Sequence, residues 1–213
     1  MSKSFWAVIA VIVVIFGGIL LLNGHKNSPG SSSNAKPTSH IEGKGATGVT
    51  LIEYGDYQCP YCGEFYPFVK QVAAKYNDQI YFQFRNLPLI QVHQNALAAA
   101  RAAEAASNQG KFWEMHDLLY ENQSAWAEGG SPQATFDRFA TQLGLNVAQF
   151  DKDAASAATN DIINADLAAF DKTGAEKSTP AFFVDGKLVN PKAISADALS
   201  VFIDQAIAAK KKS

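Results

Sequence analysis

Apolar and polar positions divide the chain into an apolar amino-terminal stretch, a polar connection and a long patterned remainder. Residues 5–22 read FWAVIAVIVVIFGGILLL without a charge. At about 1.5 Å per residue, a helix of this length just crosses a hydrocarbon core. Residues 23–48 are rich in Gly, Ser, Asn, Pro and Thr and predict a flexible linker. Residues 49–213 are long enough to form one domain with its own core.

The apolar stretch predicts a single-pass signal anchor. Lys3 precedes it, which favours cytoplasmic residues 1–4 and a catalytic domain on the extracytoplasmic side of the cell membrane. A cleaved signal peptide is the alternative, but no small-x-small site follows Leu22 and no cysteine is present there for lipid attachment.

Residues 49–85 show the pattern of a strand, a helix and a second strand. The first strand, VTLIEY at 49–54, is short and apolar, and the second is IYFQFR at 80–85. Pro60 suits the first helical position between them, and Pro67 is expected to kink that helix. This order predicts a parallel strand pair joined by a right-handed crossover.

Residues from about 92 to 172 contain helical patterns and no convincing strand. These comprise an alanine-rich run that ends near Gly110, a face at Phe112, Met115 and Leu119, a helix starting at Ser131-Pro132, and a stretch over 146–170. This region predicts a helical insert.

The strand pattern then returns near the carboxyl end. Residues 181–184 and 187–189 flank Asp185-Gly186, which is a strong signal for a hairpin. Ser195 is placed to cap a last helix with one apolar stripe. The fold class is therefore α/β.

The charge pattern argues against a nucleic-acid partner. The formal net charge is -2, and the cationic residues are scattered apart from Lys210, Lys211 and Lys212. No basic stripe is available to follow a phosphate backbone.

The chain has two cysteines, and both lie where the first strand gives way to the first helix, as Cys59-Pro60-Tyr61-Cys62. A bridge across so short a loop contributes about 2 kcal/mol through unfolded-state entropy, against almost 5 kcal/mol for a hundred-residue loop. A role in redox chemistry explains the spacing better. Cys59 falls at the helix N-cap, where free N–H groups favour its thiolate, and Cys62 is expected to be the buried resolving thiol.

Two alternatives to redox chemistry were weighed. The cysteines could be buried free thiols, or half of a zinc site. A zinc site needs four ligands, and the histidines (His25, His40, His93 and His116) have no ligand spacing. No metal site and no cofactor are predicted, and His93 and His116 are assigned no role.

The motifs EYGDYQCPYC at 53–62, GKFWEMHDLLYENQ at 110–123 and STPAFFVDGKLV at 178–189 resemble the DsbA-like branch of the thioredoxin superfamily, including its membrane-anchored bacterial members. The resemblance covers roughly residues 42–209. It implies a thioredoxin-like fold with an inserted helical subdomain. It also implies a cis peptide at Thr179-Pro180, beside the dithiol, where substrate backbone would pair. An ordinary trans proline at a strand start is the alternative.

The resemblance gives Glu53 and Tyr61 particular meaning. Glu53 matches an acidic residue buried beneath the dithiol, where a raised pKa would suit proton exchange with Cys62. A strand-edge glutamate in water is the alternative, and Arg85 is a candidate charge partner. Tyr61 stands where strongly oxidising members carry histidine. C-P-Y-C also occurs in glutaredoxins, which are small domains without such an insert.

The leading functional prediction is an oxidase that introduces disulfides into reduced, unfolded exported proteins. Its implied partner is a quinone-linked membrane reoxidase of the DsbB-like or VKOR-like kind. The first alternative is a disulfide reductase or isomerase of the same fold. The second is a non-catalytic chaperone or binding module.

Overall fold

The computed structural model describes residues 35–212. Three sequence predictions therefore lie outside the described residues, namely the cytoplasmic segment 1–4, the anchor 5–22 and the first part of the linker. None of the helices within residues 35–212 has both the length and the apolarity required to cross a membrane.

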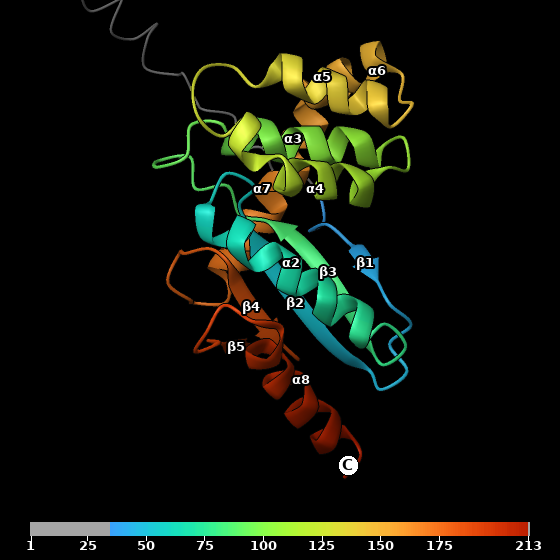
Figure 1. Cartoon of the computed structure of the whole chain (residues 1–213), viewed down its shortest axis with the longest axis vertical. Helices are drawn as coiled ribbons and strands as arrows, with labels where there is room; N and C mark the ends of the chain where they lie inside the picture. Colours follow the sequence, from blue (N-terminus) through green and yellow to red (C-terminus); the bar gives the residue numbers. More distant parts are fainter. Residues whose placement is uncertain (1–34, 213) are drawn as a thin grey trace, which may run out of the picture. The chain divides into compact units, whose positions relative to one another are not determined.

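A five-stranded mixed sheet forms the centre of the described chain, with the order β1-β3-β2-β4-β5 (Figure 1). Its central strands β2 and β3 are parallel, as their pattern predicts, and every other pair is antiparallel. The strands are β1 (His40–Glu42), β2 (Val49–Gly55), β3 (Ile80–Asn86), β4 (Ala181–Val184) and β5 (Lys187–Val189).

Helices α2 (Pro60–Lys75) and α8 (Ala196–Lys210) pack against each other and against one face of the sheet (Figure 1). Alternate residues of β2, Val49 and Leu51, point into this layer and join its apolar cluster. Ser195 caps α8 as predicted, since its hydroxyl accepts a hydrogen bond from the N–H of Ala198 at 3.2 Å. Pro67 lies inside α2 and does not end it.

The helical layer between β3 and β4 consists of α3 (Ala96–Ser107), α4 (Phe112–Glu121), the short 3-10 helix η1 (Gln123–Ala125), α5 (Gln133–Gln142), α6 (Val147–Ala154) and α7 (Ala157–Asp171). The single helical stretch expected over 146–170 is wrong, because the chain breaks between α6 and α7. Ser156 explains the break: it has extended backbone angles, and its hydroxyl accepts the N–H of Thr159 at 3.1 Å.

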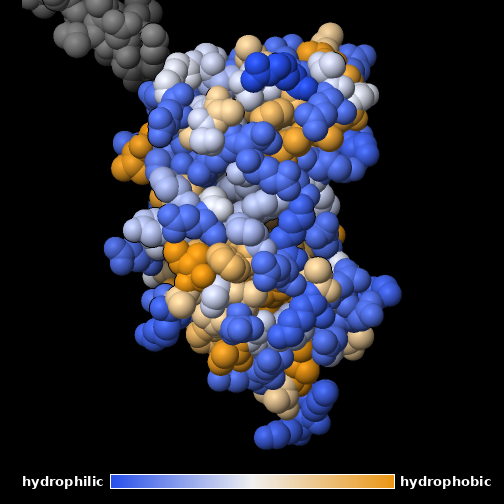
Figure 2. Space-filling model, in the orientation of Figure 1, coloured by the Kyte–Doolittle hydropathy of each residue, from blue (hydrophilic) through white to orange (hydrophobic). Residues whose placement is uncertain are grey.

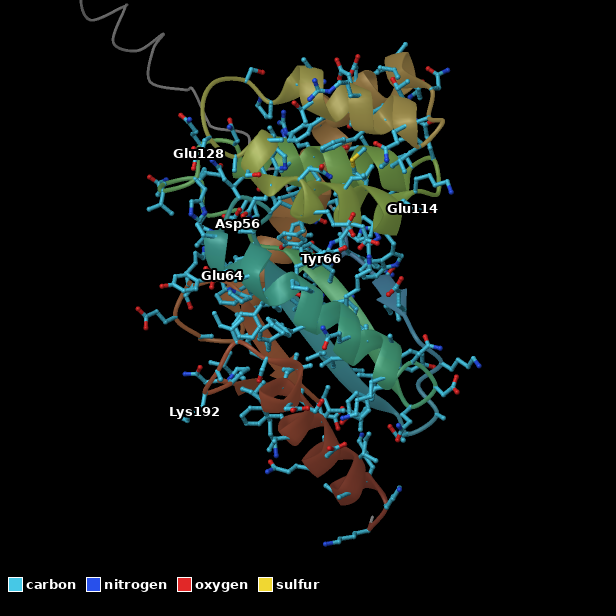
Figure 3. The ribbon with its side chains drawn as sticks, in the orientation of Figure 1. Asp56, Glu64, Tyr66, Glu114, Glu128 and Lys192 are labelled. Carbon is cyan, nitrogen blue, oxygen red and sulfur yellow. The ribbon has the colours of Figure 1, made fainter. Side chains whose placement is uncertain are left out.

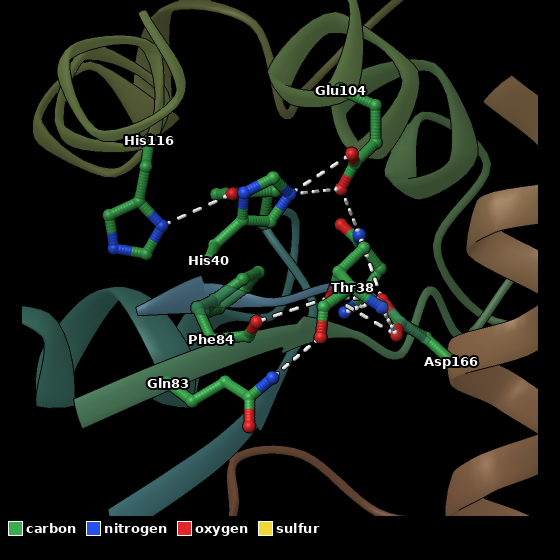
Figure 4. A network of polar contacts seen from close by, with 9 residues as sticks. Thr38, His40, Gln83, Phe84, Glu104, His116 and Asp166 are labelled. Atoms are coloured by element: carbon green, nitrogen blue, oxygen red, sulfur yellow. Dashed lines mark hydrogen bonds and ion pairs between the residues drawn. The ribbon is translucent and has the colours of Figure 1, made fainter. Parts of the chain in front are cut away.

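Part of the expected linker belongs to the folded unit, which corrects the linker prediction for residues 35–48. Strand β1 pairs with β3, and the Thr38 hydroxyl donates to the Asp166 carboxylate at 2.8 Å (Figure 4). The His40 ring stacks on Phe112 and lies 3.0 Å from both carboxylate oxygens of Glu104. The sequence hid this strand because it is three residues long and is held by partners far along the chain.

Candidate active site

The two cysteines lie at the amino-terminal end of α2, where the sheet meets the helical layer. Pro60 is the first helical residue, so Cys59 takes the N-cap position with an extended backbone (φ -66°, ψ 123°). Both cysteines are free thiols and belong to the apolar cluster under the helical layer. Cys59 keeps 5 % of its surface exposed, while Cys62, one turn further, is fully buried.

The surroundings of Cys59 stabilise its thiolate. The hydrogen bond from the Cys62 thiol has the largest effect, and the Thr179 side chain and hydrogen bonds with the backbone of Cys62 and Tyr61 add to it. Partial burial opposes these contacts, and the net result lowers the pKa of Cys59 from 9.0 to about 6. At neutral pH Cys59 is therefore mostly thiolate, which is both the attacking and the better leaving form.

Cys62 has the opposite electrostatic environment. Burial is the main reason that its pKa is raised well above 9.0, and the Cys59 sulfur and the Glu53 charge raise it further. It stays protonated at neutral pH and acts as a hydrogen-bond donor to Cys59. At neutral pH the Cys59 thiol is thus mostly ionised, whereas the Cys62 thiol is protonated.

Glu53 lies on β2, on the same side of the strand as Val49 and Leu51, and is buried. Its neighbours across the sheet are Phe84 on β3 and Phe182 on β4. The pKa of Glu53 is raised from 4.5 to about 8, mainly because burial removes water from its carboxyl group and secondly because of the Cys59 charge. The strand-edge alternative in water is therefore excluded by the structure.

Arg85 is not the charge partner of Glu53. In the parallel register Arg85 stands opposite Tyr54, and its guanidinium donates to the Tyr54 hydroxyl at 2.8 Å. Neighbouring strand positions point to opposite faces of a sheet, so Glu53 and Tyr54 lie on different sides. Within residues 35–212 no salt bridge involves Glu53.

The segment before β4 brings a third part of the chain to the dithiol. The Thr179-Pro180 peptide bond is cis, as the resemblance implies. The Thr179 carbonyl accepts a hydrogen bond from the Cys59 thiol at 3.4 Å. Residues 120 positions apart therefore meet at the reactive sulfur. Tyr61, between the cysteines, is 62 % exposed.

Asp56 is a site residue that the sequence analysis missed. It lies just before α2 (Figure 3) and is fully buried, and its carboxylate accepts hydrogen bonds from the N–H of Gln58 at 2.8 Å and of Leu89 at 2.9 Å. His93 donates to it from Nδ1 at 2.7 Å. Asp56 thus fixes the turn that presents Cys59. Its position three residues before the cysteine, where aspartate commonly closes a local turn, was the available signal.

Gln123 is a second missed residue, and it holds the backbone of the dithiol turn. Its side-chain amide donates to the carbonyls of Tyr57 at 2.7 Å and of Cys59 at 2.9 Å. Gln123 lies in η1, so the helical layer directly supports the turn. Only tertiary packing reveals this role.

The histidines have structural surroundings. His93 lies in the loop before α3, whereas the sequence pattern predicts a helix there. His116 is buried in α4 beside the Tyr57 hydroxyl at 3.1 Å, and burial lowers its pKa to about 3, so it is neutral. No group of three or more His, Cys, Asp or Glu side chains within residues 35–212 is arranged to hold a metal ion.

The mixed sheet of this order, with a helix that begins at a buried dithiol, agrees with the thioredoxin-like fold predicted from the sequence. The chain belongs to the thioredoxin family, because the family profile described as Thioredoxin matches residues 35–205. The predicted thioredoxin-like α/β fold is therefore confirmed.

Several solved structures have a fold similar to that of the chain. A thioredoxin-like oxidoreductase from Silicibacter pomeroyi is 28 % identical with a TM-score of 0.64, over 78 % of this chain and 90 % of that one. BdbD from Bacillus subtilis shares the fold at 21 % identity and a TM-score of 0.67, over 82 % and 97 % of the two chains. DsbA from Xylella fastidiosa shares it at 18 % identity and 0.64, over 84 % and 92 %. These structures confirm the predicted likeness of the fold to that of DsbA-like proteins.

Curated relatives carry a different name. The Na(+)/H(+) antiporter NhaA 3 of Salinispora tropica is 37 % identical over 172 residues, which are 76 % of this chain and 24 % of that protein. The Na(+)/H(+) antiporter NhaA of Herminiimonas arsenicoxydans is 35 % identical over 148 residues, or 70 % and 22 %. The chain spans about a quarter of the length of these relatives.

The predicted location is corrected by these findings. The curated relatives are named Na(+)/H(+) antiporters, a name that does not fit a single-pass cell-membrane oxidoreductase with an extracytoplasmic catalytic domain. The location prediction is therefore wrong. It rested on a hydropathy pattern within residues 5–22, which lie outside the described residues.

Proposed function

We propose that the chain is a protein disulfide oxidase, which transfers the disulfide of Cys59 and Cys62 to reduced, unfolded proteins. The observation that carries the proposal is the contrast between the two thiols, with the Cys59 pKa lowered to about 6 and the Cys62 pKa raised. Stabilising the thiolate of the reduced form makes the disulfide form a stronger oxidant. Access directs an incoming thiol to the sulfur of Cys59, because Cys62 is fully buried.

The proposed reaction has two exchange steps. A substrate thiolate attacks Cys59 Sγ, the Cys59–Cys62 bond breaks, and the Cys62 sulfur leaves as a thiolate that takes up a proton. A second substrate thiolate then attacks the substrate sulfur of the mixed disulfide, and Cys59 leaves as a thiolate. The substrate has lost two electrons to the dithiol and gained a disulfide.

Glu53 and Thr179 have supporting roles in this proposal. Glu53, with its pKa raised to about 8, is protonated at neutral pH and can give a proton to the departing Cys62 thiolate. The Thr179 carbonyl, 3.4 Å from Cys59 Sγ, lies where an extended substrate backbone would pair beside the reacting sulfur. Pro60 fixes the helix start, and Tyr61 is exposed between the two cysteines.

Each turnover leaves both cysteines reduced, so the proposal requires a partner that takes two electrons from them. The resemblance to DsbA-like proteins implies a quinone-linked membrane reoxidase of the DsbB-like or VKOR-like kind. Such a partner would have to reach Cys59, because Cys62 is fully buried.

Reduction of substrates is the competing direction, and one feature favours it. Tyr61 replaces the histidine of strongly oxidising members, and the Cys59 pKa of about 6 is closer to about 7 for thioredoxin than to about 3.5 for DsbA. An equilibrium titration of the full chain against glutathione, read by thiol alkylation, separates the two. A potential near about -120 mV supports the oxidase, and one near about -270 mV supports a reductant.

Oxidation of a reduced, unfolded protein by the pre-oxidised chain tests the chemistry itself. We expect one substrate disulfide per chain, and none from the Cys59→Ser variant. Formation of substrate disulfides by Cys59→Ser at the wild-type rate would rule out the proposed mechanism.

A further inference from the structure

A hollow of about 670 Å³ lies beside the loop that joins β3 to α3. Its lining includes the loop residues Leu89, Ile90 and Val92. It also includes Leu97 of α3, Leu167 of α7 and Lys177. We call this hollow the loop groove. None of these residues takes part in the dithiol chemistry described above.

The rim of the loop groove exposes large apolar side chains to solvent. Ile90 is 55 % exposed and Val92 is 72 % exposed. In Figure 2, hydrophobic side chains stand out at the left edge of the molecule, at the height of this loop in Figure 1. Exposed apolar side chains gathered around a hollow are typical of a surface that binds a partner.

The loop groove is connected to the reactive sulfur on two sides. Asp56, in the turn before Cys59, binds the loop through the N–H of Leu89 at 2.9 Å and through His93 at 2.7 Å. On the other side, Lys177 lines the groove two residues before Thr179, whose carbonyl accepts from the Cys59 thiol. The turn that carries Cys59 and the segment that carries Thr179 are therefore both joined to residues of the groove.

The charge of the loop groove restricts its occupant. Arg101 and Lys177 are among its lining residues, and none of those residues is acidic. Lys177 pairs with Asp171 at 2.9 Å, but both side chains are exposed, so this ion pair is weak and can exchange for another carboxylate. The lining thus combines apolar contacts with positive charge.

We infer that the loop groove binds an extended segment of the reduced protein substrate, through large apolar side chains near the substrate cysteine, with an acidic residue beside them. The inference rests on the proposed disulfide exchange at Cys59. Cysteines of folded proteins are among the most buried residues, so the neighbours of a substrate cysteine are often apolar and become exposed when the substrate is unfolded. The groove lets the enzyme prefer unfolded chains over small thiols.

The test compares two pairs of serine substitutions in the full chain. The groove variant carries Ile90→Ser and Val92→Ser. The matched control carries Ile41→Ser on β1 and Val201→Ser on α8, which remove an isoleucine and a valine that are 48 % and 51 % exposed and do not line the groove. All four positions are exposed, so both variants are expected to fold.

Oxidation rates are measured with three probes: dithiothreitol, a peptide with one cysteine flanked on both sides by leucines and an aspartate, and the same peptide with serines replacing the leucines. The chain is pre-oxidised and reacts in a single turnover, in which two peptide molecules pass two electrons to the Cys59–Cys62 disulfide and become a disulfide-linked dimer. We expect the wild type and the control to favour the leucine peptide by about tenfold in the second-order rate constant. The groove variant should lose most of this preference and keep its rate with dithiothreitol.

The outcomes separate this inference from the proposed function. An unchanged leucine preference in the groove variant would overturn the groove, and so would an equal loss in the control. Failure of the wild type to exchange disulfides with dithiothreitol would instead overturn the proposed oxidoreductase chemistry at Cys59.

Discussion

The surroundings of Cys59 and Cys62 have opposite effects on the thiol pKa, although the two residues lie one helical turn apart. Cys59 is at the N-cap of α2 and has a carbonyl, backbone amides and a thiol around its sulfur. Cys62 is fully buried near the carboxyl group of Glu53. The same side chain thus has its pKa lowered at one position and raised at the other. The position of each cysteine in the helix therefore sets its thiol pKa, since the residue type is the same.

The largest expected effect is in the reactivity of the two thiols. In the reduced protein at pH 7, iodoacetamide should modify Cys59 at least about a thousandfold faster than Cys62, because Cys59 is mostly thiolate and Cys62 is both protonated and buried. Mass spectrometry after timed quenching measures both rates. The Cys59 rate should follow a titration with a midpoint near pH 6.

The same reaction in 8 M urea is the control, where the two cysteines should react at similar rates. Equal rates in the native protein would contradict the division of roles between the two thiols.

The next effect concerns the carboxyl group beneath Cys62. Glu53 has a pKa of 4.5 in the unfolded chain and about 8 in the folded one. As the pH rises from 4.5 through 8, the unfolded chain loses this proton first, so the unfolded state binds fewer protons and stability falls. Glu53→Gln removes that loss and should stabilise the reduced protein by roughly 3 kcal/mol at pH 7, falling to about 1 kcal/mol at pH 5.

Urea denaturation of the reduced protein at both pH values measures this effect. Glu64→Gln, on the exposed side of α2 (Figure 3), is the matched control and should change the free energy of unfolding by less than about 0.5 kcal/mol at either pH. If the Glu53→Gln effect were the same at pH 5 and pH 7, burial of a protonated carboxyl group would be excluded.

The smallest expected effect comes from the exposed residue between the cysteines. Tyr61→His would add a titratable ring beside Cys59 and should lower the pKa of Cys59 by about one unit when the imidazole is charged, which is about 30 mV in potential. The glutathione titration at pH 6 and pH 8 measures it, and the shift should be larger at pH 6. Tyr81→His, at another exposed tyrosine on β3, should leave the potential unchanged.

The local parts of the site were predictable from the sequence, because they depend on residues close together along the chain. Pro60 at a helix start puts Cys59 at the N-cap whatever packs around it. The alternation of β2 likewise put Glu53 among residues that face one layer. The resemblance then supplied the cis bond at Thr179-Pro180, which local propensity alone does not favour.

The wrong expectations share a cause, which is dependence on distant partners. The linker prediction failed over residues 35–48, because β1 and Thr38 are held by β3 and by Asp166, more than a hundred residues from Thr38. Arg85 is a candidate partner of Glu53 because it lies in the second strand of the pattern, but the register of β2 and β3 puts it beside Tyr54.

Cysteine spacing, helix starts and strand alternation act over a few residues, so the chain alone predicted the dithiol, the α/β class and the order of elements from β2 onward, apart from the break between α6 and α7. The electrostatics of the site depend instead on tertiary packing. Burial of Cys62 and Glu53, the approach of Thr179 to Cys59, and the support from Asp56 and Gln123 all require segments that are far apart in the chain. The physical reason is that a pKa depends on which groups surround an atom in space and on how much water they exclude.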